Sequence, residues 1–186
     1  MNTLKLAALL LVLGTVIALP LSAQDSEDKP IREIGVGTYN LSNNFNLIYK
    51  KELEENKYRR YDASVNFNFN KSNNDPNAEQ VNTSFSFTLS TENRKYLNEK
   101  FKFVHGLFYG LGISLYSIND QMQTRINPQA GYQLGVQYDI NDQFYVGAAT
   151  FPGVSLGLSF DDNDAWISHA GLSFSPAAEV SVIYRF

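Results

Sequence analysis

The stretch from Asn127 to Ile140, NPQAGYQLGVQYDI, alternates between two kinds of residue. Its even positions are apolar or aromatic, from Pro128 through Leu134 to Ile140, whereas its odd positions are mostly Gln and Gly. Successive side chains of a β-strand point to opposite faces. This two-residue period therefore predicts a strand with one apolar and one polar face.

The same alternation recurs along the chain, for example at 61–70, 81–92 and 101–118, and no sustained helical period follows the first 23 residues. We therefore predict an all-β protein. The expected strands lie at roughly 33–41, 44–52, 59–70, 80–92, 101–118, 127–140, 143–160 and 166–186. Eight is an even number, as single-chain bacterial barrels require.

The last two expected strands each contain a proline, Pro152 and Pro176. Because proline interrupts strands, splitting 143–160 and 166–186 at these residues would give ten strands, which is the alternative. The apolar face continues in register through both prolines. We therefore expect eight strands, with local bulges at the prolines.

Two sets of connections alternate between these strands. One set is rich in Asn, Asp and Pro and is expected at 42–43, 71–77, 119–126 and 161–164. The other set is expected at 53–58, 93–100 and 141–142. Alternation of this kind is expected if each set lies on one side of a membrane.

Composition excludes several classes of protein. The 186 residues include no cysteine, which excludes a disulfide framework, a thiolate zinc site and a cysteine nucleophile. The net charge of −4 disfavours nucleic-acid binding, which depends on basic clusters. Thirteen Phe and eleven Tyr occur in a chain with a mean hydropathy of −0.25, so the aromatic residues are interleaved with polar ones.

The N-terminus has the pattern of an export signal. Lys5 precedes an apolar run at 6–19, and the sequence Leu-Ser-Ala at 21–23 fits a cleavage site. The run is shorter than the roughly 20 residues that a membrane-spanning helix needs, and it fits a signal-peptide core. We predict a signal peptide at 1–23, a short segment at 24–32 and a barrel at 33–186. An uncleaved N-terminal anchor is the alternative, and the shortness of the apolar run disfavours it.

The two faces of the strands distinguish a membrane barrel from a soluble β-sandwich. The second face carries mainly Gly, Ser, Asn and Gln rather than the Lys and Glu of an ordinary solvent surface. Small and neutral polar side chains fit the interior of a narrow barrel, while Phe, Tyr and Leu on the other face would meet lipid. A β-sandwich is the alternative, because alternation alone fits it equally well.

The register also places ten charged residues inside the barrel. They are Glu33, Lys50, Glu52, Arg60, Asp62, Glu92, Lys102, Asp139, Glu179 and Arg185. Most lie at the strand ends opposite the Asn-rich connections, where opposite charges could pair and plug the lumen. A gated ion path is the alternative, and the plugged lumen is favoured because eight strands leave little interior space.

The last strand alternates Val180, Val182, Tyr184 and Phe186 with more polar positions, and the sequence stops on that phenylalanine. Together with the export signal and eight amphipathic strands, this resembles the small eight-stranded outer-membrane β-barrels of Gram-negative bacteria, the OmpA-like and OmpX-like porin-family proteins. The resemblance implies an antiparallel up-and-down transmembrane barrel in the outer membrane. It also implies outer-membrane lipid as a partner, and recognition of the strand that ends at Phe186 by the barrel-insertion machinery.

No constellation of residues indicates chemistry. Some small outer-membrane barrels modify lipid A with a His, a Ser and an acid, but His105 and His169 face opposite ways in the eight-strand register, and Ser168 and Ser173 lie near His169 only in sequence. We predict no catalytic, cofactor-binding or metal-binding residues. The acidic run of Asp161, Asp162 and Asp164 is read as a solvated turn rather than a calcium site, because it lacks EF-hand spacing.

The sequence therefore predicts an outer-membrane barrel with a structural role or a binding role through its outer loops. A small pore for ions or small solutes is the first alternative, and a lipid-modifying enzyme is the second.

Overall fold

The structure is a computed structural model that describes residues 30–39, 45–71, 79–118, 121–161, 167–174 and 177–186. The predicted signal peptide at 1–23 lies outside the described residues. The chain is described as ten strand segments: β1 (Arg32–Tyr39), β2 (Phe45–Glu54), β3 (Lys57–Lys71), β4 (Glu79–Tyr96), β5 (Phe101–Ile118), β6 (Gln121–Asp139), β7 (Phe144–Phe151), β8 (Gly153–Asp161), β9 (Ile167–Phe174) and β10 (Ala177–Arg185).

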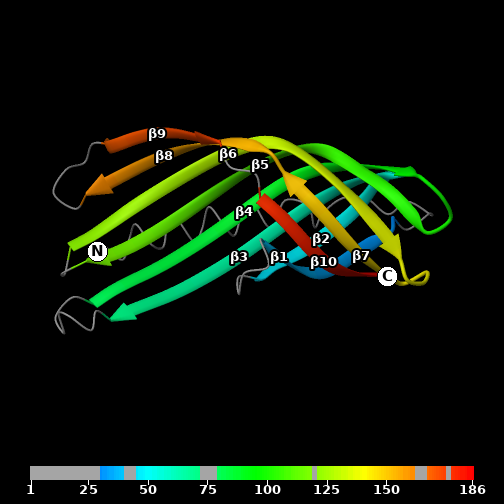
Figure 1. Cartoon of the computed structure of the whole chain (residues 1–186), viewed down its shortest axis with the longest axis horizontal. Coiled ribbons are helices and arrows are strands. Elements are labelled where there is room, and N and C mark those ends of the chain that lie inside the picture. Colours follow the sequence, from blue (N-terminus) through cyan, green and yellow to red (C-terminus); the bar gives the residue numbers. More distant parts are fainter. Residues whose placement is uncertain (1–29, 40–44, 72–78, 119–120, 162–166, 175–176) are drawn as a thin grey trace.

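The segments form a closed antiparallel barrel of eight strands (Figure 1). Around the ring the order is β1, β2, β3, β4, β5, β6, β7 and β10, and the β1–β10 pairing closes it. β8 continues the line of β7 and also pairs with β6, while β9 continues the line of β10 and pairs with β8. The closed ring confirms the barrel and rejects the β-sandwich.

Pro152 interrupts a strand without shifting its register, and Pro176 lies outside the described residues. On the two sides of Pro152, Leu134 pairs with Thr150 and Gly131 pairs with Gly153, a step of three residues on each strand. Proline has no N–H to donate, but the Pro152 carbonyl still accepts a hydrogen bond of 3.0 Å from the Tyr132 amide. The prediction of continuous register is therefore confirmed.

The predicted bulge at Pro152 is wrong, because the register is the same on its two sides. The described residues on the two sides of 175–176 keep one register, with Ala177 opposite Phe151 and Phe174 opposite Val154. The break at Pro152 is a lost ladder bond, which does not require an extra residue. The one register shift in this pair of strands lies between Ser159 and Phe160 instead.

The short turns gather at one end of the barrel together with the C-terminus and the start of β1 (Figure 1). Two of them share a design, LNEKF from Leu97 and INDQF from Ile140. In each, the Asn side chain accepts hydrogen bonds from amides two and three residues ahead, at 2.7–2.9 Å. Such Asx turns are a common way to close a tight hairpin. The third, at Glu55 and Asn56, places Asn56 at a positive φ of 62°.

The predicted connection at 119–126 is wrong. Residues 119–126 were expected to be a loop, but β6 begins at Gln121, and its first residues pair with β5 as far as Ile126 opposite Ile113. The composition is polar, which suggests a loop, yet Met122, Thr124 and Ile126 still alternate with Gln and Arg. Pairing to a long neighbouring strand stabilises this segment as a strand despite its polarity.

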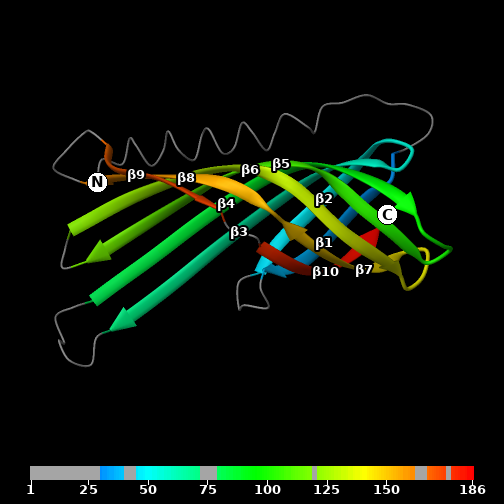
Figure 2. The ribbon, with the colours of Figure 1, turned by 45° about the horizontal axis from the view of Figure 1, so that its top comes forward.

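The strands differ in how far they extend toward the other end, which we call the outer end. β1 and β2 stop at Tyr39 and Phe45, whereas β3 to β6 continue well beyond them (Figure 2). β3, for example, continues past Ser64, the last residue paired with β2. Among the described residues, the ring of eight is therefore complete near the short turns, and the outer half is built from β3, β4, β5, β6, β8 and β9.

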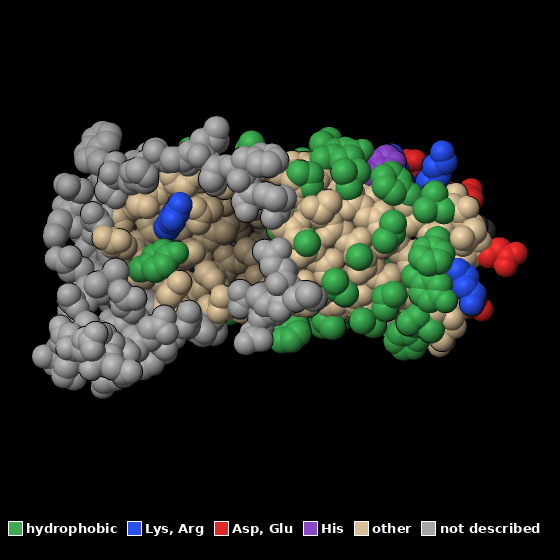
Figure 3. Space-filling model, in the orientation of Figure 1, with side chains coloured by type: hydrophobic (Ala, Val, Ile, Leu, Met, Phe, Trp, Pro, Cys, Tyr) green, Lys and Arg blue, Asp and Glu red, His purple; other side chains and the backbone are tan. Residues whose placement is uncertain are grey.

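The outer wall of the barrel is apolar. Outward-facing Leu107, Tyr109, Val136 and Val182 each expose between 44% and 55% of their surface, which a water-soluble protein would bury. Figure 3 shows hydrophobic side chains distributed over this wall, with charged side chains gathered at the end that carries the short turns. This is the surface pattern of a membrane-spanning barrel.

Within the described residues, no helix has the length and apolar character needed to cross a membrane.

Candidate functional site

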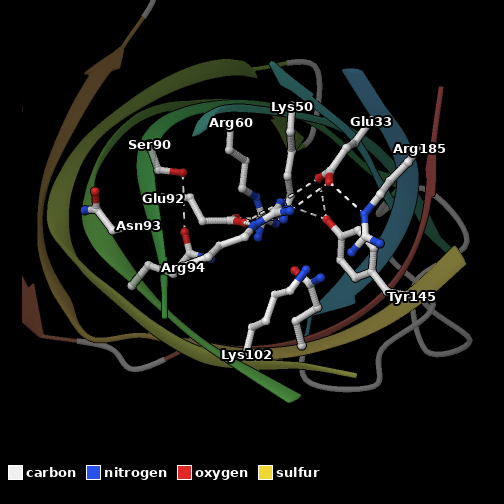
Figure 4. A network of polar contacts seen from close by, with 12 residues as sticks. Glu33, Lys50, Arg60, Ser90, Glu92, Asn93, Arg94, Lys102, Tyr145 and Arg185 are labelled. Atoms are coloured by element: carbon white, nitrogen blue, oxygen red, sulfur yellow. Dashed lines mark hydrogen bonds and ion pairs between the residues drawn. The ribbon is translucent and has the colours of Figure 1, made fainter. Parts of the chain in front are cut away.

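The lumen near the short turns is filled by ion pairs (Figure 4). Five basic and five acidic side chains meet there from all around the ring. The basic ones are Lys50, Arg60, Arg94, Lys102 and Arg185, and the acidic ones are Glu33, Asp62, Glu92, Asp139 and Glu179. We call these ten residues the lumen network. The predicted pairing of inward charges is confirmed for nine of the ten predicted residues.

Arg94 is the centre of the network. Its Nε donates to Glu92 at 2.7 Å, and its Nη1 and Nη2 donate to the two carboxylate oxygens of Glu33 at 2.7 and 2.6 Å. The guanidinium lies 3.6 Å from the ring centroid of Tyr58, and Nη2 is also 3.1 Å from the hydroxyl of Tyr145. A fork-shaped donor set of this kind matches a carboxylate on two sides, which a lysine could not do.

The network extends from Arg94 in two directions. Beyond Glu92, Lys50 donates to that carboxylate at 2.7 Å. Beyond Glu33, Arg185 links Glu33 at 3.2 Å to Asp139 at 2.5 Å, and Lys102 completes the chain at 3.0 Å from Asp139. The chain thus crosses the lumen from wall to wall.

A second cluster lies around Arg60. Its Nε donates to Asp62 at 2.9 Å and its Nη2 to Glu179 at 2.7 Å, while the Asn46 amide donates to Glu179 at 3.0 Å. The Arg60 guanidinium lies 5.3 Å from the ring centroid of Phe151. This cluster carries one more negative than positive charge, and the chain around Arg94 carries one more positive, so the network as a whole is neutral.

Glu52 is the predicted inward charge outside the ion pairs. It lies at the rim, half-buried, where its carboxylate accepts a hydrogen bond from the Ile31 amide at 3.4 Å. Its strand is distorted by a register shift between Glu52 and Glu54, which ends regular pairing with β3. The charge therefore caps the edge of the barrel rather than joining the network.

Sequence reasoning missed Arg94, although this residue makes most contacts in the network. The expected strand ended at residue 92, and 93–100 was expected to be a connection, but β4 continues to Tyr96. The signal was present, because Ser90, Glu92 and Arg94 continue the two-residue period of the inward face. Tyr145, which donates to Glu33 at 2.6 Å, was not identified as part of the site either.

The outer half of the lumen contains a cavity of about 310 Å³. Aromatic side chains separate it from the network: Phe151 packs edge-to-face on Phe108 at 5.6 Å and on Tyr39 at 5.7 Å between ring centroids. The remaining lining is Ser86, Thr88, Gly112, Asn127, Gln129, Gly153, Val154, Ser155 and Ala177. These lining residues are all neutral, and Figure 3 shows the molecule hollowed in its outer half, with a Lys or Arg side chain inside the hollow.

The candidate catalytic histidines do not form a site together. His105 is on the outer wall, where its Nδ1 lies 2.7 Å from the hydroxyl of Tyr132 and its ring stacks on Phe103. His169 is on β9 opposite Ser159, but its side chain and those of Ser168 and Ser173 lie outside the described ones. Of the acidic run, Asp162 and Asp164 lie outside the described residues. Elsewhere in the described chain, no group of three or more His, Asp or Glu side chains is arranged to hold a metal ion.

The comparisons with known proteins agree with the fold. No family model and no curated protein matches the chain. Among solved structures, the attachment invasion locus protein Ail of Yersinia pestis, in complex with the heparin analogue sucrose octasulfate, matches with a TM-score of 0.51 and 14% identity, over 86% of this chain and all of that one. A major outer membrane protein from Thermus thermophilus matches with a TM-score of 0.51 and 12% identity, again over 86% and 100%. The chain therefore has the fold of the small eight-stranded outer-membrane β-barrels.

Proposed function

We propose that this protein is a non-conducting barrel in the outer membrane of a Gram-negative bacterium, with a structural role or a binding role through its outer loops. The observation that carries the proposal is the lumen network. Ten charged side chains, paired at 2.5–3.2 Å, occupy the cross-section of the barrel near the short turns. An ion could pass only by displacing partners that are largely removed from water, which is costly.

Because the lumen is closed near the short turns, we expect any binding to take place at the outer end. Small outer-membrane barrels have short periplasmic turns and longer extracellular loops. The end with the short turns accordingly faces the periplasm, and the cavity faces outward. Its hydroxyl, amide and aromatic groups are able to hold a small uncharged polar molecule or a side chain of a partner.

Single-channel recording in planar lipid bilayers tests the closed lumen. The purified barrel should give no sustained current. As a matched comparison, the double variant Glu33→Ala with Arg94→Ala removes one charge of each sign from the centre of the network and should give measurable conductance. A reproducible open channel in the unmodified protein would instead support the small pore.

Cell fractionation followed by electrophoresis with and without heating tests the location. A folded barrel resists detergent until it is heated, so the membrane fraction should contain a band whose mobility changes on heating. Recovery of the folded protein in the soluble periplasmic fraction would contradict the proposal.

We also propose that the barrel-insertion machinery recognises β10 by pairing a strand with it. Val180, Val182 and Phe186 expose 46%, 48% and 60% of their surface along its outward face. Phe186→Ala should lower the amount of heat-modifiable barrel in the membrane. Phe144→Ala is the control, since Phe144 is another exposed aromatic residue at the same end, beside Tyr184. Equal losses in both variants would indicate a general effect of aromatic residues.

A further inference from the structure

Three basic residues form a row across the outer wall near the short turns. Arg32 of β1 is directly opposite Lys51 of β2, and Lys51 is directly opposite Arg59 of β3. All three have the opposite parity to the inward-facing Glu33, Lys50 and Arg60, so their side chains lie on the outside. We call these three residues the basic row.

The folded protein alone does not explain the basic row. Like charges directly opposite each other on one face of a sheet destabilise the pairing. Among the described residues, no carboxylate lies within ion-pair distance of any of the three.

The acidic side chains nearby are engaged elsewhere. Glu52 accepts from the Ile31 amide, Glu54 pairs with Lys57 at 3.5 Å, and Glu55 accepts from Asn56 at 3.5 Å. A carboxylate at Phe186, whose backbone pairs with that of Arg32, would balance one of the three charges. The basic row therefore keeps a positive charge that the protein does not balance. An anion from outside the protein would neutralise it.

The position of the basic row indicates what that anion is. One step further along the same strands, Ile34 is opposite Tyr49, and Tyr49 is opposite Tyr61, with ring centroids of the two tyrosines 6.0 Å apart. Tyrosines of membrane proteins concentrate at the level of the lipid headgroups, and basic side chains extend from there toward the phosphates. The basic row lies next to Ile34, Tyr49 and Tyr61, on the side nearer the short turns.

We propose that Arg32, Lys51 and Arg59 bind the phosphate of an anionic glycerophospholipid in the membrane leaflet at the short-turn end. Two guanidinium groups and one ammonium group provide forked and single donors to phosphate oxygens. Adjacent strands are about 4.8 Å apart, so the three cations can surround one headgroup. This inference rests on the proposed membrane location.

Native mass spectrometry of the detergent-solubilised barrel tests the proposal with equal amounts of phosphatidylglycerol and phosphatidylcholine. The unmodified protein should retain phosphatidylglycerol preferentially. The triple variant Arg32→Gln, Lys51→Gln, Arg59→Gln should lose this preference, with binding weaker on the order of tenfold. The absence of any preference in the unmodified protein would overturn the proposal.

A matched control separates a site from overall charge. Lys57→Gln, Lys95→Gln, Lys100→Gln removes the same charge from the same end, but these residues do not form a row. This control should retain the preference, and an equal loss in both triple variants would overturn the site. Lys51→Gln alone, at the centre of the basic row, gives the same test with the least disturbance of folding.

Heat-dependent mobility of each variant keeps the two proposals distinguishable. A barrel that is heat-modifiable and recovered in membranes, yet shows no lipid preference, would contradict the basic row alone. A protein found folded in the periplasm would contradict the location on which it rests.

Discussion

The two halves of the lumen are built differently, although β3 to β6 run through both. Near the short turns, the ring is complete and its interior is filled by the ten charges of the lumen network. In the outer half, the described wall is β3, β4, β5, β6, β8 and β9, and the interior contains a cavity of about 310 Å³ whose lining residues are neutral. Phe108 and Phe151 separate the two.

The difference indicates which half of the lumen stabilises the barrel and which half is available for binding. Buried ion pairs tie strands together across the lumen, so loss of one partner leaves an unpaired charge away from water. Polar groups around an open cavity can exchange a protein partner for water at small cost. The filled half should therefore be sensitive to substitution, whereas the outer half should tolerate it and remain available for binding.

The largest effect is expected from Arg94→Met. This change removes the cation between Glu33 and Glu92, which both remain buried, and should lower the free energy of unfolding by about 3 kcal/mol or more. Urea titration of the barrel in detergent micelles measures it. Lys95→Met is the control, because Lys95 is the next residue and is exposed; its effect should stay within about 0.5 kcal/mol. Similar losses in the two variants would show that the network contributes no more than a surface residue.

The second-largest effect is expected from a comparison of two glycines of β5, Gly106 in the filled half of the lumen and Gly112 in the outer half. A Cβ at Gly106 would overlap the carbonyl oxygen of Thr91 on β4, so Gly106→Ala must push strands apart in the filled half. The cost should be about 1–3 kcal/mol, as for other overpacked sites. At Gly112, the nearest atom to a new Cβ is 3.6 Å away, so Gly112→Ala should be neutral in the same urea titration. Equal tolerance at the two positions would mean that the halves are packed alike.

Much of the filled half could be predicted from the sequence, since inward and outward positions alternate strictly and a charge on the inward face of a narrow barrel needs a partner. Arg94 was missed because strand ends depend on the partner strand: β4 continues past Asn93, the last residue paired with β3, because it still pairs with β5, where Arg94 is opposite Val104. The cavity could not be predicted. It depends on how far β1 and β2 extend relative to β3 and β4, which the alternation of a single strand does not encode.

A smaller effect is expected at the rim of the network from Lys102→Met. Lys102 pairs with Asp139 at 3.0 Å, but Asp139 also accepts from Arg185 and from Gln137 at 2.7 Å. The carboxylate therefore keeps two donors, and the loss should be about 1 kcal/mol. The same unfolding measurement tests it. A loss as large as that of Arg94→Met would mean that the rim and the centre form one cooperative unit.

The smallest effect is expected in the wall of the cavity, from Ser86→Ala. The Ser86 hydroxyl is 2.7 Å from the hydroxyl of Ser64 on the neighbouring strand, a pair of the kind that contributes up to about 1 kcal/mol when water is excluded. Here Ser86 lines the cavity and Ser64 is half-buried, so water can replace the lost partner. The unfolding free energy should change by less than about 0.5 kcal/mol. Ser90→Ala is the matched comparison on the same strand, because Ser90 is fully buried in the filled half and lies 3.4 Å from Gln133. If Ser86→Ala costs as much as Ser90→Ala, the outer cavity is as dry as the filled half, and it would then select apolar rather than hydrated ligands.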